Sequence, residues 1–276
     1  MERPFCQVDV FADELYFGNP VAVILDGKGL TTEEMQQFAS WTNLSETTFV
    51  VPPEAVGADY RVRIFTPSRE LPFAGHPTLG TCHAWLAAGG TSRRPDMIVQ
   101  ECDAGLIELR RIDGALAFAA PPLLRSGPVD EQTLERVVAA LGIARAEVVD
   151  AQWVDNGPGW VGVLLESADA VLALRPGLAD LDIGVAGPHP AGSPVAFEVR
   201  AFSPALGGVG EDPVTGSLNA SLAGWLLAAG HATAPYVASQ GTALGRRGRV
   251  RITHDADGTI WVGGSTTTGV TGTADL

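Results

Sequence analysis

The sequence predicts an α+β fold of two similar halves, each a mostly antiparallel β-sheet wrapped around one strongly apolar helix. Three observations support this fold class. One short motif occurs twice, about 136 residues apart. Segments with a strand pattern outnumber those with a helix pattern, and short turns join many of them. Each copy of the motif leads into an Ala/Leu-rich helical stretch with little polar face, which is typical of a helix buried on nearly all sides.

The repeated motif is a polar residue, Pro, two spacers, Gly and a hydroxyl residue. The first copy, within 75–81, runs from His76 to Thr81, and the second, within 211–217, runs from Asp212 to Ser217. Pro costs least in the first turn of a helix, and Gly lets the backbone approach a ligand closely. Either copy alone is equally well explained as an ordinary capped helix after a loop. Two matching copies favour a pair of helix N-termini that receive a small anion.

The first half is expected to begin with a hairpin and to continue with an amphipathic helix and further strands. Thr31 or Thr32, with Glu33 and Glu34, caps and charges the start of that helix, which ends near Asn43. Strands are predicted at 5–11, 21–25, 46–51, 60–65, 97–101, 105–112 and 115–119, with the apolar helix at 82–88.

Pro121-Pro122 interrupts the pattern before the second half. Helices are expected at 129–141 and 168–174, and the second apolar helix at 218–229. Strands are expected at 147–153, 160–165, 195–202, 248–253 and 259–262. Gly89 and Gly230 follow the two apolar helices, where C-terminal glycines are favoured.

Composition excludes several classes of protein. The net charge is -14 without a dense basic cluster, so a nucleic-acid partner is not expected. No apolar run approaches the roughly 18 residues of a membrane span, and no secretory leader is recognisable, so a soluble cytoplasmic protein is expected. Three cysteines at unrelated spacings indicate reduced thiols, and the five histidines share no metal-ligand spacing.

Three polar residues are candidates for proton chemistry. Glu46 opens a predicted strand, where taken alone it is a solvated strand end. His76 and Asp212 each precede the motif proline, where they can cap the helix, bond a substrate or carry a proton. Thr81 and Ser217 can likewise cap or bind.

Six segments of the chain stand out together: Gly18 to Val23, Asn43 to Thr47, Ile64 to Pro67, Glu70 to Pro77, Asn156 to Pro158 and Glu211 to Ser217. In their order over nearly the whole chain, they resemble the phenazine biosynthesis PhzF-like family. The resemblance implies a diaminopimelate-epimerase-like fold of two pseudo-symmetric barrel-like halves with the active site in the cleft between them. It divides the chain into 1–120, completed by a C-terminal strand near 265–276, and 121–264.

The same resemblance implies a cofactor-free isomerase that forms homodimers and acts on a small carboxylate-bearing substrate. In it Glu46 matches the acid/base residue, and His76, Asp212 and Ser217 match polar residues of the pocket. Gly75 and Gly216 match positions whose backbone approaches the substrate, and Thr81 is expected to bind beside them.

The expected mechanism is proton transfer by Glu46, with the two helix termini holding the substrate carboxylate and the delocalised charge. Two alternatives remain at this point. A small-acid binding or regulatory protein would keep the cleft without turnover. An amino-acid epimerase is disfavoured, because related racemases use one cysteine at each helix start, whereas this chain has Cys82 inside the predicted helix.

Overall fold

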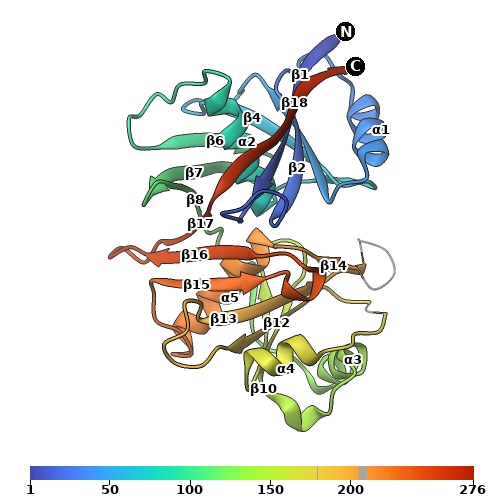
Figure 1. The fold of residues 1–276 in the computed structure, drawn as a ribbon, viewed down its shortest axis with the longest axis vertical. Helices are drawn as coiled ribbons and strands as arrows, with labels where there is room; N and C mark the ends of the chain where they lie inside the picture. Colours follow the sequence, from blue (N-terminus) through green and yellow to red (C-terminus); the bar gives the residue numbers. More distant parts are fainter. Residues whose placement is uncertain (179, 205–209) are drawn as a thin grey trace. The chain divides into compact units, whose positions relative to one another are not determined.

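The structure is a computed structural model that describes residues 1–178, 180–204 and 210–276. It divides into two compact units (Figure 1): unit 1 comprises 1–119 with 263–276, and unit 2 comprises 120–262. Residues 205–209, which precede the second motif, lie outside the described residues. Both units combine helices with a mixed sheet, in which antiparallel pairs outnumber parallel ones.

Unit 1 builds its sheet from both ends of its sequence. Its strands are β1 (Glu2–Val10), β2 (Asn19–Ile24), β3 (Glu46–Val51), β4 (Tyr60–Phe65), β5 (Glu70–Leu71), β6 (Ile98–Cys102), β7 (Gly105–Ile112), β8 (Ala115–Ala119) and β18 (Thr266–Asp275). Pairing runs β18-β1-β2-β3-β4-β6-β7-β8, and β5 adds to the end of β4. Only β2–β3 and β4–β6 are parallel among these pairs.

The two helices of unit 1 begin in different ways. Helix α1 (Thr32–Thr42) connects β2 to β3, and Thr31 and Glu34 form the expected capping box. Helix α2 (Gly75–Ala87) connects β5 to β6 and packs against β1, β2, β3, β8 and β18. Its close approach to the sheet needs Gly80, because a Cβ there would lie 2.3 Å from a methyl group of Val21.

Unit 2 repeats this arrangement. Its strands are β9 (Arg125–Pro128), β10 (Val148–Asp155), β11 (Val161–Leu165), β12 (Ile183–Pro188), β13 (Phe197–Phe202), β14 (Glu211–Asp212), β15 (Tyr236–Gln240), β16 (Gly248–His254) and β17 (Ile260–Gly264). The last two residues of β17 belong to unit 1. Pairing runs β9-β10-β11-β12-β13-β15-β16, with β14 on the end of β13. The parallel pairs, β11–β12 and β13–β15, occupy the same places as those of unit 1.

The helices of unit 2 follow the same plan with one addition. Helix α4 (Ala168–Ala173) connects β11 to β12, and α5 (Gly216–Ala228) connects β14 to β15, as α1 and α2 do in unit 1. Helix α3 (Glu131–Leu141) lies between β9 and β10 and packs with α4 in a separate apolar cluster that includes Leu134, Val137 and Val171. Helix α5 is buried over most of its length and packs against β10, β12 and β16.

The two units do repeat one another, but the sequence prediction aligned the two copies of the motif five residues out of register. Both buried helices begin at the glycine: α2 begins at Gly75, seven residues before the predicted start at 82, whereas α5 begins at Gly216, within two residues of the predicted start at 218. Glu70 pairs with Phe65 as Glu211 pairs with Phe202, so the equivalent segments are Glu-x-Pro-x-x-Gly, 141 residues apart. Pro77 therefore lies inside the first turn of α2, whereas Pro213 precedes α5.

Among the described residues, five strands were missing from the sequence prediction, namely β12, β15 and the shorter β5, β9 and β14. Strand β12 contains Gly184 and Gly187, whose lack of side chains weakens the strand pattern. The glycines are there for packing, since a Cβ on Gly184 would lie 2.1 Å from Leu218 of α5. Strand β15 is short and ends in the polar residues Ser239 and Gln240, which weakens its apolar pattern. Both are buried, and Gln240 accepts a hydrogen bond from the Thr215 backbone N–H.

Candidate functional site

In unit 1 the structure brings Glu46 and His76 together. Glu46 is the first residue of β3, and His76 is the second residue of α2. The Nε2 atom of His76 lies 3.3 Å from Oε2 of Glu46, an ion-pair distance without the alignment of a hydrogen bond. The Glu46 side chain is 15% exposed and that of His76 only 3%. Glu46 is thus a largely buried carboxylate at a helix start, and not a solvated strand end.

Asn19 contacts the His76 ring nitrogen that does not face Glu46. Nδ2 of Asn19 lies 3.2 Å from Nδ1 of His76, and because an amide nitrogen donates, Nδ1 accepts. A neutral imidazole then carries its proton on Nε2, the atom that faces Glu46. Burial lowers the pKa of His76 from 6.5 to about 3, so the ring is neutral near pH 7.

The buried helices differ from the others in how they begin. Side chains of Thr31, Asp130 and Ser167 accept hydrogen bonds from the first turns of α1, α3 and α4. At α2 and α5 the preceding residues, Ala74 and Thr215, make no such bond. The first-turn N–H groups at Gly75 and Gly216 therefore remain directed beyond the helix end, an arrangement that suits an anion.

In unit 2 the second motif forms a polar cluster at the start of α5. Oγ1 of Thr215 donates to Oδ2 of Asp212 at 2.5 Å. Ser217, at the position equivalent to His76, receives a hydrogen bond from Nε1 of Trp160 at 3.3 Å on its hydroxyl and one from Nδ2 of Asn156 at 3.0 Å on its carbonyl. Asp212 and Ser217 thus lie on either side of the helix start, with Gly216 between them in sequence.

The sequence predicts Thr81 at a helix start, but the structure places it inside α2. It is the seventh residue of α2, is fully buried, and donates a hydrogen bond of 2.8 Å to Oγ1 of Thr48 on β3. The five-residue error in register explains the misplacement, because the structural counterpart of Ser217 is His76. In this position the Thr81 hydroxyl ties α2 to the sheet.

Sequence reasoning missed Asn19, Thr215 and Gln240 as members of these clusters. Asn19 and Asn156 stood inside the segments that carry the family resemblance, so an Asn beside Gly and Pro at a strand start was an available signal. Nothing in the local pattern distinguished Gln240, because its contact with Thr215 joins β15 to the start of α5.

The cysteines do not supply reactive thiolates. All three are buried, and burial raises the pKa of Cys6 and Cys102 to about 11 and that of Cys82 to about 12. Cys82 is the eighth residue of α2 and is far along the helix from its first turn. These thiols are inert at neutral pH.

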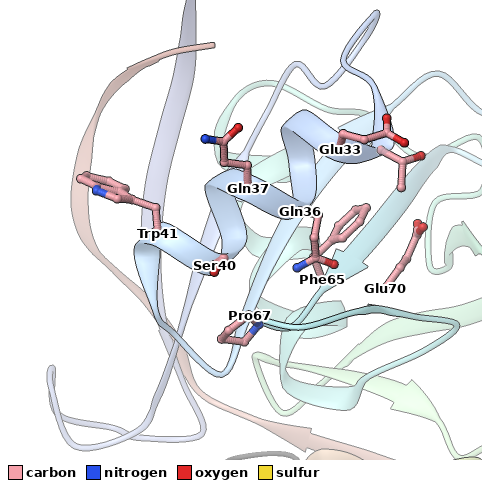
Figure 2. Close-up of a pocket in the computed structure, with 9 residues that line it drawn as sticks. Glu33, Gln36, Gln37, Ser40, Trp41, Phe65, Pro67 and Glu70 are labelled. Carbon is pink, nitrogen blue, oxygen red and sulfur yellow. The ribbon is translucent and has the colours of Figure 1, made fainter.

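A surface groove of unit 1 lies apart from the Glu46–His76 pair. It has a volume of about 720 Å³ and runs along α1 (Figure 2), where Glu33, Gln36, Ser40 and the 80%-exposed Trp41 line it together with residues of β4 and β5. Neither Glu46 nor His76 lines it.

The described residues contain neither a metal-binding group nor a membrane-spanning helix. Within 1–178, 180–204 and 210–276, His, Cys, Asp and Glu form no group of three or more placed to hold a metal ion. No helix in the same ranges is long and apolar enough to cross a membrane. The expectation that both motifs serve one cleft stays a prediction from the sequence.

Comparison with known proteins gave consistent matches. A family model described as phenazine biosynthesis-like protein (PhzC-PhzF) matches residues 8–275. The chain is 38% identical to "Antisense-enhancing sequence 1" of Schizosaccharomyces pombe over 98% of each chain. It is 39% identical to trans-2,3-dihydro-3-hydroxyanthranilate isomerase of Pseudomonas aeruginosa over 88% of this chain and 87% of that protein. The crystal structure of a PhzF family protein from Enterococcus faecalis aligns over 100% of both chains, with a TM-score of 0.79 at 27% identity.

Proposed function

We propose that this chain, which belongs to the PhzC-PhzF family of phenazine biosynthesis-like proteins, is an isomerase that moves a proton within a small carboxylate-bearing substrate. The observation that carries the proposal is the 3.3 Å contact between the Glu46 carboxylate and the neutral His76 imidazole at the uncapped start of α2. Relatives named as isomerases, at 32% and 39% identity, support the reaction class.

Glu46 is the proposed acid and base. A carboxylate in a mostly water-excluded place can take a proton from a carbon atom and return it to another carbon on the same face of the substrate. Nε2 of the neutral His76 ring faces this carboxylate at 3.3 Å without adding a competing positive charge. A neutral imidazole can also donate a hydrogen bond to an enolate oxygen that forms during the transfer.

The starts of α2 and α5 are the proposed anion-binding elements. Their uncapped N–H groups, at Gly75 and Gly216, and the positive ends of the helix dipoles favour a substrate carboxylate and the developing negative charge. Asp212 and Ser217 offer an acceptor and a hydroxyl for amino or hydroxyl groups of the substrate. The substrate of the Pseudomonas relatives, trans-2,3-dihydro-3-hydroxyanthranilate, carries all three kinds of group and is the first compound to test.

Epimerase chemistry through two thiols is a weaker candidate. It requires one thiolate at each helix start, whereas those positions hold Gly75 with His76 and Gly216 with Ser217. We further propose that the chain acts as a homodimer. Sedimentation analysis should then give about twice the monomer mass of 28.8 kDa.

The test compares wild type with Glu46→Gln. Isomerisation of trans-2,3-dihydro-3-hydroxyanthranilate is followed by absorbance, and binding of the same acid by calorimetry. The expected result is a loss of kcat of at least about 10³-fold with a Kd that changes little, because the substitution removes the base and keeps the shape. Glu33→Gln, the same change on an exposed part of α1, is the control and keeps wild-type rates.

Three outcomes separate the alternatives. Wild-type activity in Glu46→Gln removes Glu46 from the mechanism. Tight binding of small carboxylic acids without turnover of any of them identifies a binding or regulatory protein. Loss of chirality in an amino or hydroxy acid, without isomerisation, identifies an epimerase.

A further inference from the structure

A buried polar network at the start of α5 contains a link to a carboxylate that unit 1 lacks. It joins Asp212, Thr215, Asn219 and Gln240, of which Gln240 is 0% and Asn219 2% exposed. The equivalent positions of unit 1, from the strand registers and the helix starts, are Leu71, Ala74, Thr78 and Cys102. Unit 1 joins the same strand and helix differently, by Gln100 of β6, which is 0% exposed and donates to Oγ1 of Thr78 at 2.9 Å. It has neither a carboxylate at Leu71 nor a hydroxyl at Ala74, so the fold does not require the link from Gln240 through Thr215 to Asp212.

The hydrogen bonds of the network have a fixed direction. Oε1 of Gln240 accepts from the Thr215 backbone N–H at 3.0 Å and from Nδ2 of Asn219 at 2.8 Å. The other end of the same amide, Nε2, therefore donates to Oγ1 of Thr215 at 2.9 Å and to the Asp212 carbonyl at 3.2 Å. With a lone pair taken by Gln240, the Thr215 hydroxyl directs its own proton to Oδ2 of Asp212.

We propose that Thr215 and Gln240 are positioning residues, which hold the Asp212 carboxylate in one orientation and in its ionised form at the start of α5. Because the Thr215 hydroxyl must donate, it keeps Oδ2 of Asp212 as an acceptor, and a hydrogen bond donated to a carboxylate favours its ionised form. The role of this carboxylate toward substrate rests on the proposed function. It would accept a hydrogen bond or a proton from an amino or hydroxyl group of the substrate.

A substitution at Thr215 leaves the charged side chains on the neighbouring elements unchanged. Arg200 on β13 is held by Glu211 in two hydrogen bonds of 2.9 and 2.7 Å. The turn after β15 brings Arg246 toward the motif, since a Cβ on Gly241 would lie 2.6 Å from the Pro213 carbonyl oxygen and 2.7 Å from Cβ of Arg246. A difference between Thr215 variants therefore reports the hydroxyl itself.

The experiment uses Thr215→Ala, with Thr215→Ser as the conservative variant that keeps the hydroxyl. Alanine stands at the equivalent position of unit 1, so it is compatible with this helix start, and Thr215→Val replaces it should Thr215→Ala not fold. The pKa of Asp212 is measured by NMR titration of ¹³C-labelled aspartate, with Asp212→Asn identifying the signal. The kcat and KM values for the isomerisation are measured in parallel.

The expected result is a pKa of Asp212 about one unit higher in Thr215→Ala than in wild type, restored by Thr215→Ser. The kcat falls about 10-fold or more in Thr215→Ala, whereas KM changes less than about 3-fold. An unchanged pKa and kcat in Thr215→Ala, or failure of Thr215→Ser to restore them, overturns the positioning role. The titration decides this even when no substrate turns over, and full isomerase activity in Asp212→Asn contradicts only the role given to Asp212 in the proposed function.

Discussion

The two units share one strand order, one helix order and several side-chain contacts, but they differ in what lies at the start of the buried helix. Arg63 and Glu70 in unit 1 form the same two-bonded ion pair as Arg200 and Glu211 in unit 2. Each arginine also lies about 5 Å above the ring of the phenylalanine two residues further on. The framework is therefore repeated down to individual pairs.

At the helix starts the repeat ends. Unit 1 places a carboxylate and a neutral imidazole there, Glu46 and His76, whereas unit 2 places Ser217 and the hydrogen-bonded Asp212. The contacts among Arg, Glu and Phe at the strand ends are the same in both units, whereas the side chains at the start of the buried helix are not. We infer from this difference that the shared pairs maintain the fold and that the differing residues carry the proposed chemistry.

The largest expected effect separates His76 from its counterpart Ser217. His76→Asn removes the N–H that faces Glu46, so kcat for the proposed isomerisation should fall about 10²-fold or more. Ser217→Ala should cost less than about 10-fold, because the uncapped amides of α5 remain. Steady-state kinetics of the two variants measure the difference, and equal losses would contradict the division of roles between the units.

Stability should respond to the repeated ion pair more strongly in unit 2. Arg200 and Glu211 are 6% and 8% exposed, and Arg63 and Glu70 are 19% and 23% exposed. Arg200→Met leaves a buried carboxylate alone and should lower the free energy of unfolding by about 3 to 5 kcal/mol. Arg63→Met should cost about 1 kcal/mol. Denaturant unfolding of both variants gives the comparison, and a larger loss for Arg63→Met would show that burial does not set the cost.

The pH dependence of stability should carry the signature of His76. Its pKa is 6.5 in the unfolded chain and about 3 in the folded one, so the unfolded chain binds more protons between these values. The free energy of unfolding therefore falls as pH is lowered from 6.5 toward 3, by up to about 1.4 kcal/mol per pH unit from this group. His76→Asn should flatten that slope, and Ser217→Ala should leave it unchanged. Urea unfolding from pH 7 to 4 measures the slopes, and parallel slopes in wild type and His76→Asn would contradict the burial of a neutral ring.

The smallest effect concerns the capped helices. Thr31→Ala breaks the capping box of α1, whose two bonds to Glu34 are 3.2 and 2.7 Å, and should cost about 1 kcal/mol. Activity should be unaffected, since α1 presents its own surface groove. A change in KM with this variant would link α1 to the substrate.

Much of the framework was predictable because it depends on local signals. The strands at 46–51, 60–65 and 105–112 have the predicted bounds, since alternation and flanking turns define them. The start of α2 was not predictable, because Gly75, His76 and Pro77 are poor helix formers that become helical through burial against the sheet. For the same reason Thr81 was assigned to the wrong end of the helix.

The candidate site was only partly predictable. Glu46 and His76 were named from their places in the sequence and from the resemblance, but they lie 30 positions apart, and only the placement of α2 beside the start of β3 shows that they touch. Thr215, Asn219 and Gln240 come together from a helix start and a strand that the sequence did not reveal. Contacts between residues distant in sequence carry no local pattern.

The most direct test of the account is the first turnover of trans-2,3-dihydro-3-hydroxyanthranilate with the protein in excess, followed by NMR in D₂O. The new carbon–hydrogen or carbon–deuterium bond should form at equal rates in wild type and Glu33→Gln, and at least about 10³-fold more slowly in Glu46→Gln. Formation of that bond by Glu46→Gln at the wild-type rate would contradict the central claim that Glu46 moves the proton.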